Sequence, residues 1–283
     1  MKLGINLLCL GGHIDDSHMP QLERIADIGY DHVEVPVMHG TPEHYEQLGR
    51  RLADLGLGRA QTSIVPDPAA NPLSDDPDVR QRGLAHLAWI QDCAEALGSQ
   101  TVGGPFHAPI GAFTGQGPTE DELARGAEAH RTMAERAARH GYTLALEPLN
   151  RFETYFLNTA AQARAYADRV DHPAFGIMYD TFHSHIEEQD QHAAIQHLGA
   201  AMRVLHVSEN DRGVVGRGQI DFAGILKTVR DTGFDGPIVV EAFGAGVPEL
   251  AAATRVWRPL FPDVETLFRE SHDTIRTLWE AAA

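Results

Sequence analysis

The chain has 283 residues, of which 43% are hydrophobic and 22% charged, as in ordinary globular proteins, and this composition excludes extensive disorder. Its 40 acidic and 23 basic residues give a net charge of −17, which opposes binding to the phosphates of a nucleic acid. With two cysteines, no apolar run of about 20 residues and no recognisable secretion signal, we expect a cytoplasmic protein without disulfides or a membrane partner.

Short apolar runs alternate with longer amphipathic segments along the whole chain. The predicted strands are 2–8, 32–37, 59–65, 101–107, 143–149, 175–181, 204–210 and 237–243. The predicted helices are 19–29, 41–56, 77–98, 121–140, 159–170, 190–198, 222–232 and 264–281. Eight strand–helix pairs in strict alternation predict an α/β fold, a (β/α)₈ TIM barrel that spans residues 1–283 as one domain. A doubly wound sheet is less favoured, because no Gly-x-Gly-x-x-Gly turn follows the first strand.

Ionisable residues interrupt the apolar runs of the last four predicted strands. They are Glu147, Asp180, His206 and Glu241. The C-terminal ends of barrel strands surround the catalytic centre, so we expect these side chains to converge there. Predicted loops at 66–78, 108–120 and 244–263 each follow a strand and belong to the same face.

Three carboxylates and one imidazole form a donor set that suits a divalent cation such as Mn²⁺, Mg²⁺ or Co²⁺. Zinc is an alternative, although it favours more nitrogen or sulfur ligands. A purely structural polar core is the other interpretation, but four buried ionisable groups at one level are costly without a cation. We therefore predict a metal site.

Three further polar residues lie a few positions beyond these ligands, on the loops after their strands. They are Glu153, His183 and Arg212. From those loops they can reach a substrate held at the metal, although a solvated helix start for His183 and a surface turn for Arg212 are the alternatives. Glu34, at the end of the second predicted strand, is either an orienting residue next to the metal ligands or an ordinary polar residue of the barrel.

Several motifs resemble the D-tagatose 3-epimerase group, the ketose 3-epimerases of the xylose-isomerase-like TIM barrels. They are LEPLNRFETYFLNT (146–159), YDTFHSHIEE (179–188), HVSENDRGVVGRGQIDF (206–222) and IVVEAF (238–243). The resemblance is dense in the C-terminal half of the chain and only architectural in the N-terminal half.

The resemblance implies a role for each of these residues. It makes Glu147, Asp180, His206 and Glu241 the metal ligands, with Glu147 and Glu241 also the acid/base pair. It makes Glu153, His183 and Arg212 the residues that hold the keto oxygen and its neighbours. It also implies Mn²⁺ as the ion, a homodimer or homotetramer, and no organic cofactor.

The sequence departs from the family at the far end of the expected pocket. The first strand reads LLCLGGH, the third QTSIVPD, and the loop after the fourth GPFHAPIGAFTG. Ser63, His107 and Phe113 are the candidates that line the tail of the substrate. These departures leave the identity of the sugar open.

The expected activity is inversion of the carbon next to the keto group of a ketose, by proton transfer between two glutamates through a cis-enediolate. The main alternative is an isomerase or dehydratase that acts on a keto-inositol or another keto-sugar, because the same set of metal ligands also supports enolisation of those substrates. A non-catalytic sugar-binding subunit is a further one. Hydride-shift aldose isomerisation is disfavoured because neither Lys2 nor Lys227 ends a strand, and a free substrate is preferred to a phosphorylated one.

Overall fold

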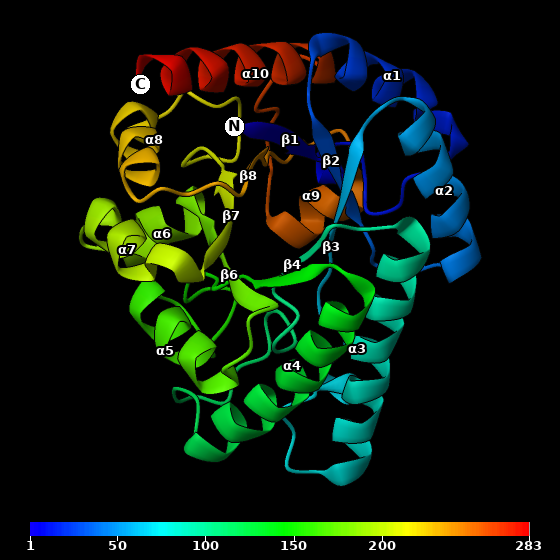
Figure 1. The fold of residues 1–283 in the computed structure, drawn as a ribbon, viewed down its shortest axis with the longest axis vertical. Helices are drawn as coiled ribbons and strands as arrows, with labels where there is room; N and C mark the ends of the chain where they lie inside the picture. The colour runs from blue at the N-terminus through cyan, green and yellow to red at the C-terminus, as the bar shows by residue number, and fades with distance from the viewer. Residues whose placement is uncertain (283) are drawn as a thin grey trace.

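Eight parallel strands close into a barrel in the computed structural model, which describes residues 1–282. The strands are β1 (Lys2–Asn6), β2 (His32–Pro36), β3 (Gly58–Thr62), β4 (Thr101–Gly104), β5 (Thr143–Leu146), β6 (Phe175–Asp180), β7 (Met202–Val207) and β8 (Pro237–Val240). Each strand pairs with the next one in the chain, and β8 pairs with β1. Figure 1 shows the strands at the centre with helices around them, which confirms the predicted (β/α)₈ TIM barrel.

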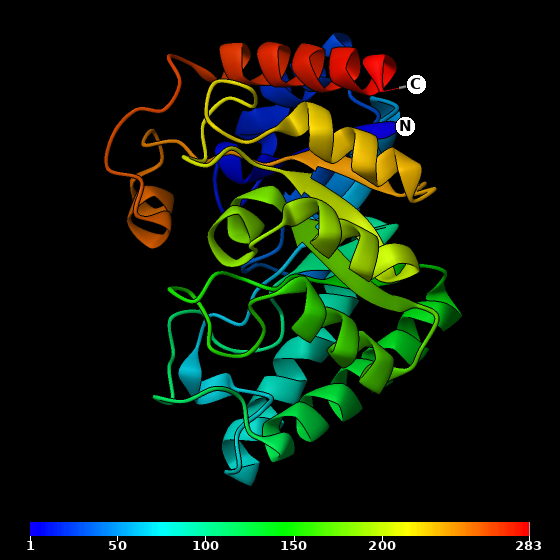
Figure 2. The ribbon, with the colours of Figure 1, turned by 90° about the vertical axis from the view of Figure 1, so that its left-hand side faces the viewer.

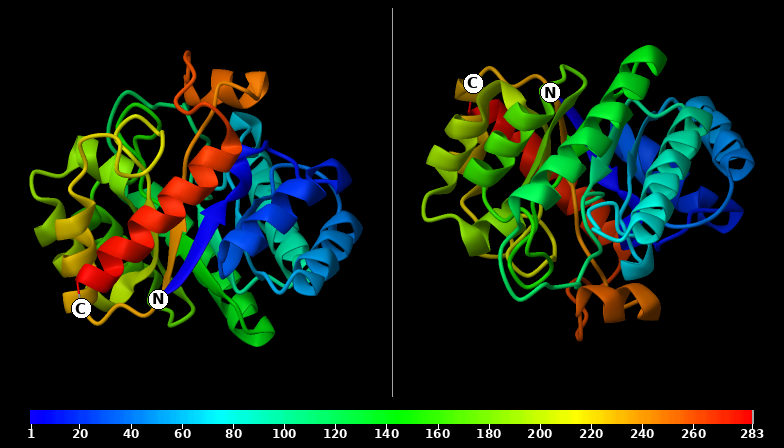
Figure 3. Two further views of the ribbon diagram at one scale, coloured as in Figure 1. Left: turned by 90° about the horizontal axis from the view of Figure 1, so that it is seen from above. Right: turned by 90° about the horizontal axis from the view of Figure 1, so that it is seen from below.

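The helices form the outer layer of the molecule. They are α1 (Met19–Ile28), α2 (Pro42–Asp54), α3 (Pro77–Leu97), α4 (Glu120–His140), α5 (Ala160–Val170), α6 (Thr181–Glu187), α7 (Gln191–Leu198), α8 (Phe222–Asp231), α9 (Pro248–Thr254) and α10 (Val264–Ala281). The last helix closes the ring against the first, since Arg24 of α1 donates to Glu265 of α10 at 2.8 Å; Figure 3 shows α10 from two sides. None of the helices in residues 1–282 has the length and apolar composition of a membrane span.

The strands end earlier than predicted, and this places the ionisable residues at the rim of the sheet. Glu147 and Glu241 are the first residues after β5 and β8. Their backbone is nevertheless held by the neighbouring strands, because Glu147 N–H donates to the carbonyl of Gly104 and Glu241 N–H to that of Val207, both at 3.1 Å. Both side chains therefore start from fixed points of the barrel.

Two helices were not predicted from the sequence. The first, α6, begins directly after Asp180, whose Oδ1 accepts hydrogen bonds from the N–H groups of Phe182 and His183 at 2.8 and 2.9 Å. The second, α9, lies within the predicted loop 244–263. Figure 2 shows α9 projecting from the side of the barrel opposite to both chain termini, where the C-terminal ends of the strands lie.

An apolar layer fills the barrel beneath the rim. Ala145, Met178, Val204 and Val239, from the last four strands, pack together with almost no exposure. Gly103 of β4 leaves room for this layer, since a Cβ there would approach Met178 Cε to 2.3 Å. Side chains of a strand alternate between faces, so the residue two positions after each member of the layer also faces the barrel axis.

Outside the barrel, the buried His130 of α4 links three segments. Its Nδ1 lies 2.6 Å from the Tyr166 hydroxyl, and its Nε2 lies 3.4 Å from the carbonyl oxygen of Phe106. Burial lowers the pKa of His130 from its usual 6.5 to about 4. The folded protein therefore keeps this imidazole neutral at pH values where the unfolded chain would bind a proton.

We expect the free energy of unfolding to fall as the pH drops from 6.5 to 4, because the unfolded state takes up a proton that the folded state excludes. The contribution of His130 is about 3 kcal/mol at the acid end of this range. Urea unfolding at pH 7 and pH 4, in EDTA, compares the wild type with His130→Gln. Between the two pH values, the free energy of unfolding of the variant is expected to fall by about 3 kcal/mol less than that of the wild type. An equal fall in both proteins would contradict the neutral state of His130 in the fold.

Candidate active site

Four buried side chains meet at the C-terminal end of the barrel. One ligand atom from each of Glu147, Asp180, His206 and Glu241 lies within 4.8 Å of the others. These residues follow Ala145, Met178, Val204 and Val239 by two positions, and the alternation of a strand therefore directs all four toward the barrel axis. We call them the four-residue cluster.

The four-residue cluster fits a divalent cation. Nδ1 of His206 is buried without a hydrogen-bond partner, 3.5 Å from Glu241 Oε1 and 3.8 Å from Asp180 Oδ2. Burial raises the pKa of Asp180 to about 6, and burial together with Glu241 raises the pKa of Glu147 well above its usual value. Buried carboxylates so close together are stabilised by a cation, and an imidazole nitrogen facing them is a suitable further ligand.

Glu34 of β2 and Asn6 of β1, the strand next to β8, support this cluster. A carboxylate oxygen of Glu34 lies 3.2 Å from Nε2 of His206. The side-chain amide of Asn6 donates to Glu34 at 2.7 Å and to Glu241 at 3.2 Å. Glu34 thus accepts the Nε2 proton of His206 and leaves Nδ1 free to bind a metal, as the orienting interpretation of Glu34 predicts. Asn6 was not singled out from the sequence, although it is a polar residue within an apolar strand.

Arg212 is buried against the cluster and is not a surface residue. Its Nη1 lies 2.6 Å from Glu241 Oε2 and 3.3 Å from Asp180 Oδ2. Its guanidinium carbon lies 3.9 Å from the centre of the Phe182 ring and 4.8 Å from that of Phe243. The backbone has a φ of 65°, which is rare for a residue with a side chain and indicates a conformation imposed by the surrounding loop.

His183 presents a proton to the same place as Arg212. Its Nδ1 accepts a hydrogen bond from the backbone N–H of Asn150 at 3.1 Å, so Nε2 carries the proton of the neutral ring. Nε2 lies 3.5 Å from Glu147 Oε1 and 2.9 Å from Nη2 of Arg212. Burial and Arg212 hold the pKa of His183 well below its usual value. Nε2 of His183 and Nη2 of Arg212 thus border one small volume beside Glu147, in which an oxygen atom of a substrate can accept a hydrogen bond.

Glu153 contacts Asn150, which in turn contacts His183. The Asn150 amide donates to Glu153 Oε1 at 2.8 Å and also lies 2.9 Å from His183 Nδ1. Glu153 is therefore in place to orient His183, through a residue that the sequence did not single out.

The three candidates for the substrate tail differ in position. Ser63 Oγ accepts from Gln61, whose amide also donates to the carbonyl of Ile90 in α3, so this hydroxyl faces the helical layer. His107 is fully buried, and its Nε2 lies 3.1 Å from the carbonyl oxygen of Glu147 while its Nδ1 has no partner. Phe113 lies on the loop after β4 with 53% of its surface exposed. The structure thus places His107 against the backbone of Glu147, whereas Ser63 faces α3.

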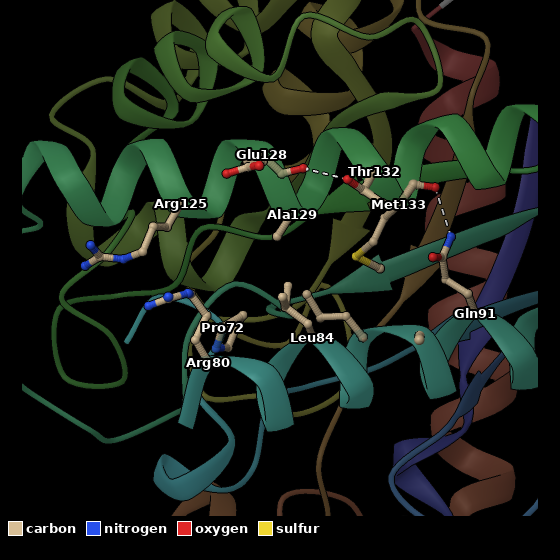
Figure 4. Close-up of a pocket in the computed structure, with 11 residues that line it drawn as sticks. Pro72, Arg80, Leu84, Gln91, Arg125, Glu128, Ala129, Thr132 and Met133 are labelled. Atoms are coloured by element: carbon tan, nitrogen blue, oxygen red, sulfur yellow. Dashed lines mark hydrogen bonds between the residues drawn. The ribbon is translucent and has the colours of Figure 1, made fainter. Parts of the chain in front are cut away.

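A groove of about 350 Å³ lies elsewhere, between α3 and α4 (Figure 4). It is lined by Pro72, Arg80, Leu84, Leu87, Ala88, Gln91, Arg125, Glu128, Ala129, Thr132 and Met133. Gln91 of α3 crosses its end and donates to the carbonyl of Met133 at 2.9 Å. None of its lining residues belongs to the four-residue cluster, so the groove is separate from the candidate active site.

Comparisons with known proteins agree with this geometry. The sequence model of the xylose isomerase-like TIM barrel family matches residues 22–278. A ketose 3-epimerase of Arthrobacter globiformis is 33% identical over 279 residues, which cover 98% of this chain and 96% of the relative. The chain belongs to the ketose 3-epimerase family of the xylose isomerase-like TIM barrels.

Other members of this family are similarly close. An L-ribulose 3-epimerase of Mesorhizobium japonicum is 33% identical over 86% of this chain and 82% of its own. A solved structure of an L-ribulose 3-epimerase superposes with a TM-score of 0.91 at 32% identity, covering 99% of this chain and 95% of that one. The similarity extends over the N-terminal half as well, where the sequence motifs had indicated only a common architecture.

Proposed function

We propose that this ketose 3-epimerase family member is itself a metal-dependent isomerase that inverts C3 of a free ketose. The observation that supports this most is the convergence of Glu147 and Glu241 with the paired donors of His183 and Arg212. Relatives named ketose 3-epimerase and L-ribulose 3-epimerase support the reaction class.

The four-residue cluster is the proposed binding site of the metal, with Mn²⁺ as the proposed ion and Co²⁺, Mg²⁺ or Zn²⁺ as alternatives. A bound divalent ion supplies Lewis acidity, which acidifies the C–H next to a ketone. Glu34 and Asn6 hold His206 and Glu241 in the orientation that such a site requires.

The two glutamates carry the proton transfers in this proposal. Glu147 and Glu241 project from β5 and β8, and each presents a carboxylate to the bound sugar. One carboxylate removes the C3 proton, which leaves the cis-enediolate, and the other delivers a proton to the opposite face of C3. One proton leaves and one arrives, so the product differs from the substrate only in the configuration of C3.

The donors on the neighbouring loops stabilise the charge that develops. Arg212 and His183 face one volume, and we propose that a substrate oxygen occupies it and gains negative charge as the C3 proton leaves. Glu153 keeps His183 oriented through Asn150. His107 and Phe113 remain our candidates for the substrate tail, whereas the hydroxyl of Ser63 contacts the tail only if it turns away from Gln61.

We also propose a cytoplasmic homodimer or homotetramer. Phe113, Phe152 and Trp257 are large side chains on loops near the barrel mouth, and 53%, 67% and 74% of their surfaces are exposed. Exposed aromatic groups of this kind are common at interfaces between subunits. Size-exclusion chromatography with light scattering tests the oligomeric state.

A substrate screen tests the proposed activity. Purified protein with added Mn²⁺ is incubated with L-ribulose, D-psicose and a keto-inositol, and the products are separated by chromatography. We expect the C3 epimer of at least one free ketose, in both directions. A dehydrated product from the keto-inositol, without any ketose epimer, would favour the dehydratase alternative and contradict the proposal.

A further inference from the structure

Glu209 is a buried carboxylate that lies outside the four-residue cluster, two residues after β7. Only 1% of its surface is exposed. The four hydrogen bonds that its oxygens accept in the described chain all come from backbone N–H groups. Oε1 accepts from Asn210, Gln219 and Ile220 at 3.0, 3.0 and 3.1 Å, and Oε2 accepts from Gly216 at 3.0 Å.

These hydrogen bonds fold the loop between β7 and α8 back onto its own start. The donors extend to Ile220, eleven positions after Glu209, so one carboxylate holds both ends of the loop together. The fit is close, because a Cβ on Gly218 would lie 2.4 Å from Glu209 Oε1 and 2.3 Å from Asn210 Oδ1. Removing the carboxylate would leave the N–H groups of Asn210, Gly216 and Ile220 without this acceptor, and the buried N–H of Ile220 would reach water only if the loop opened.

The same loop carries Arg212 and fixes its backbone. The N–H of Arg212 donates to the carbonyl of Glu209, and the carbonyl of Arg212 accepts from the N–H of Phe243, both at 2.9 Å. The φ of 65° at Arg212 is unfavourable for a residue with a side chain and persists only while its surroundings enforce it. The guanidinium that faces Glu241 and His183 thus depends on the folded form of this loop.

We propose that Glu209 is a positioning residue of the epimerase, which acts through Arg212 and does not itself touch the substrate. The inference rests on the proposed function, because the role assigned to Arg212 is stabilisation of developing charge. A displacement of about 1 Å in such a group typically lowers the rate about 100-fold. We therefore expect Glu209→Gln, which turns one acceptor into a donor facing a backbone N–H, to lower kcat more than it raises KM.

A double-mutant cycle separates this role from a general structural one. With L-ribulose and Mn²⁺, kcat/KM is measured for the wild type, Glu209→Gln, Arg212→Lys and the double variant. We expect Glu209→Gln alone to lower kcat/KM by about 10- to 100-fold, but to have almost no effect in the Arg212→Lys background. An equal loss in both backgrounds, or no loss in the wild-type background, would overturn the proposal.

A matched control and a second variant complete the experiment. Asp190→Asn makes the same carboxylate-to-amide change at a side chain that accepts from the backbone N–H groups of His192 and Ala193, and it should leave kcat/KM unchanged. Gly218→Ala pushes a methyl group against Glu209 and displaces the loop without altering the carboxylate. If Glu209→Gln does not fold, Gly218→Ala takes its place in the cycle with the same expected result.

A measurement without turnover distinguishes failure of this inference from failure of the proposed function. The Nε–H signal of Arg212 in ¹⁵N-labelled protein, identified by its loss in Arg212→Lys, reports the position of the guanidinium. We expect Glu209→Gln to shift or broaden this signal and to speed hydrogen exchange at Gly216, Gln219 and Ile220. An unchanged signal would refute the positioning role, whereas a shifted signal in a protein inactive on every ketose would refute only the proposed function.

Discussion

Replacing either Glu147 or Glu241 by glutamine is expected to lower kcat for epimerisation by about 10³-fold or more, because each variant lacks one of the two groups that move the C3 proton. Neither variant is expected to lose all reaction at C3. Each variant keeps one carboxylate, which can still remove the C3 proton from the epimer that presents this proton to it and return a solvent proton to the same face.

Deuterium exchange in D₂O makes this difference visible. We expect each variant to introduce deuterium at C3 of one epimer without inverting it, and the two variants to act on opposite epimers. NMR of the recovered sugars measures the exchange, and metal content measured in parallel shows whether the cluster still binds its ion. Glu128→Gln, on the outer groove between α3 and α4, is the matched control and should behave as the wild type. Full epimerisation by either glutamine variant would exclude the two-base mechanism.

Removing divalent metal is expected to abolish the activity and to destabilise the fold. The four-residue cluster buries three carboxylates within 4.8 Å of one another, and without a cation their repulsion is relieved by Arg212, by the hydrogen bond from Asn6 to Glu241 and by protonation. A ligand at a free concentration about 100 times its Kd stabilises the folded state by about 2.7 kcal/mol, which corresponds to about 5–10 °C in Tm for a chain of this size.

Dialysis against EDTA followed by calorimetry and an activity assay measures both effects. Added Mn²⁺ should restore the activity and the Tm together. Asp180→Asn keeps a side chain that can begin α6 but removes one carboxylate ligand, and should therefore respond much less to Mn²⁺ than the wild type. Full activity in protein shown by mass spectrometry to be free of metal would rule out the metal-dependent mechanism.

The main features of the barrel and of its cluster could be predicted because they depend on patterns that are local in the sequence. Alternating apolar and amphipathic segments determine the eight strand–helix pairs. Glu147, Asp180, His206 and Glu241 stand out because each interrupts an apolar run, where an ionisable side chain is costly unless it has a function.

Other features depend on contacts between distant segments and left no such pattern. The strand that directly precedes Ser63 reads GRAQT and has no apolar alternation to show which side faces the axis. The structure resolves this, because Ala60 pairs with the inward-facing Glu34 and the residues at odd positions then face the helices. The seven residues of α6 include few apolar side chains and form no hydrophobic stripe.

The supporting residues were equally difficult to predict. Asn150 orients His183 across 33 positions of the chain, and nothing in its immediate neighbours indicates that partner. Glu209 resembles any charged residue of a polar turn until the loop closes around it. Sequence reasoning therefore located the groups proposed to do the chemistry more readily than the groups that hold them in place.

The four-residue cluster belongs entirely to β5–β8 and the residues directly after them, and the other half of the ring contributes the side chains of Asn6 and Glu34 to its support. Because the two halves contribute so unequally to the cluster, the N-terminal half can be exchanged between related barrels. An N-terminal half taken from a family member with a different sugar preference would bring a new wall for the substrate tail while the reacting groups stay on their own strands. Such chimeras need to preserve two side chains across the seam, which makes the half-barrel a practical unit for changing substrate range.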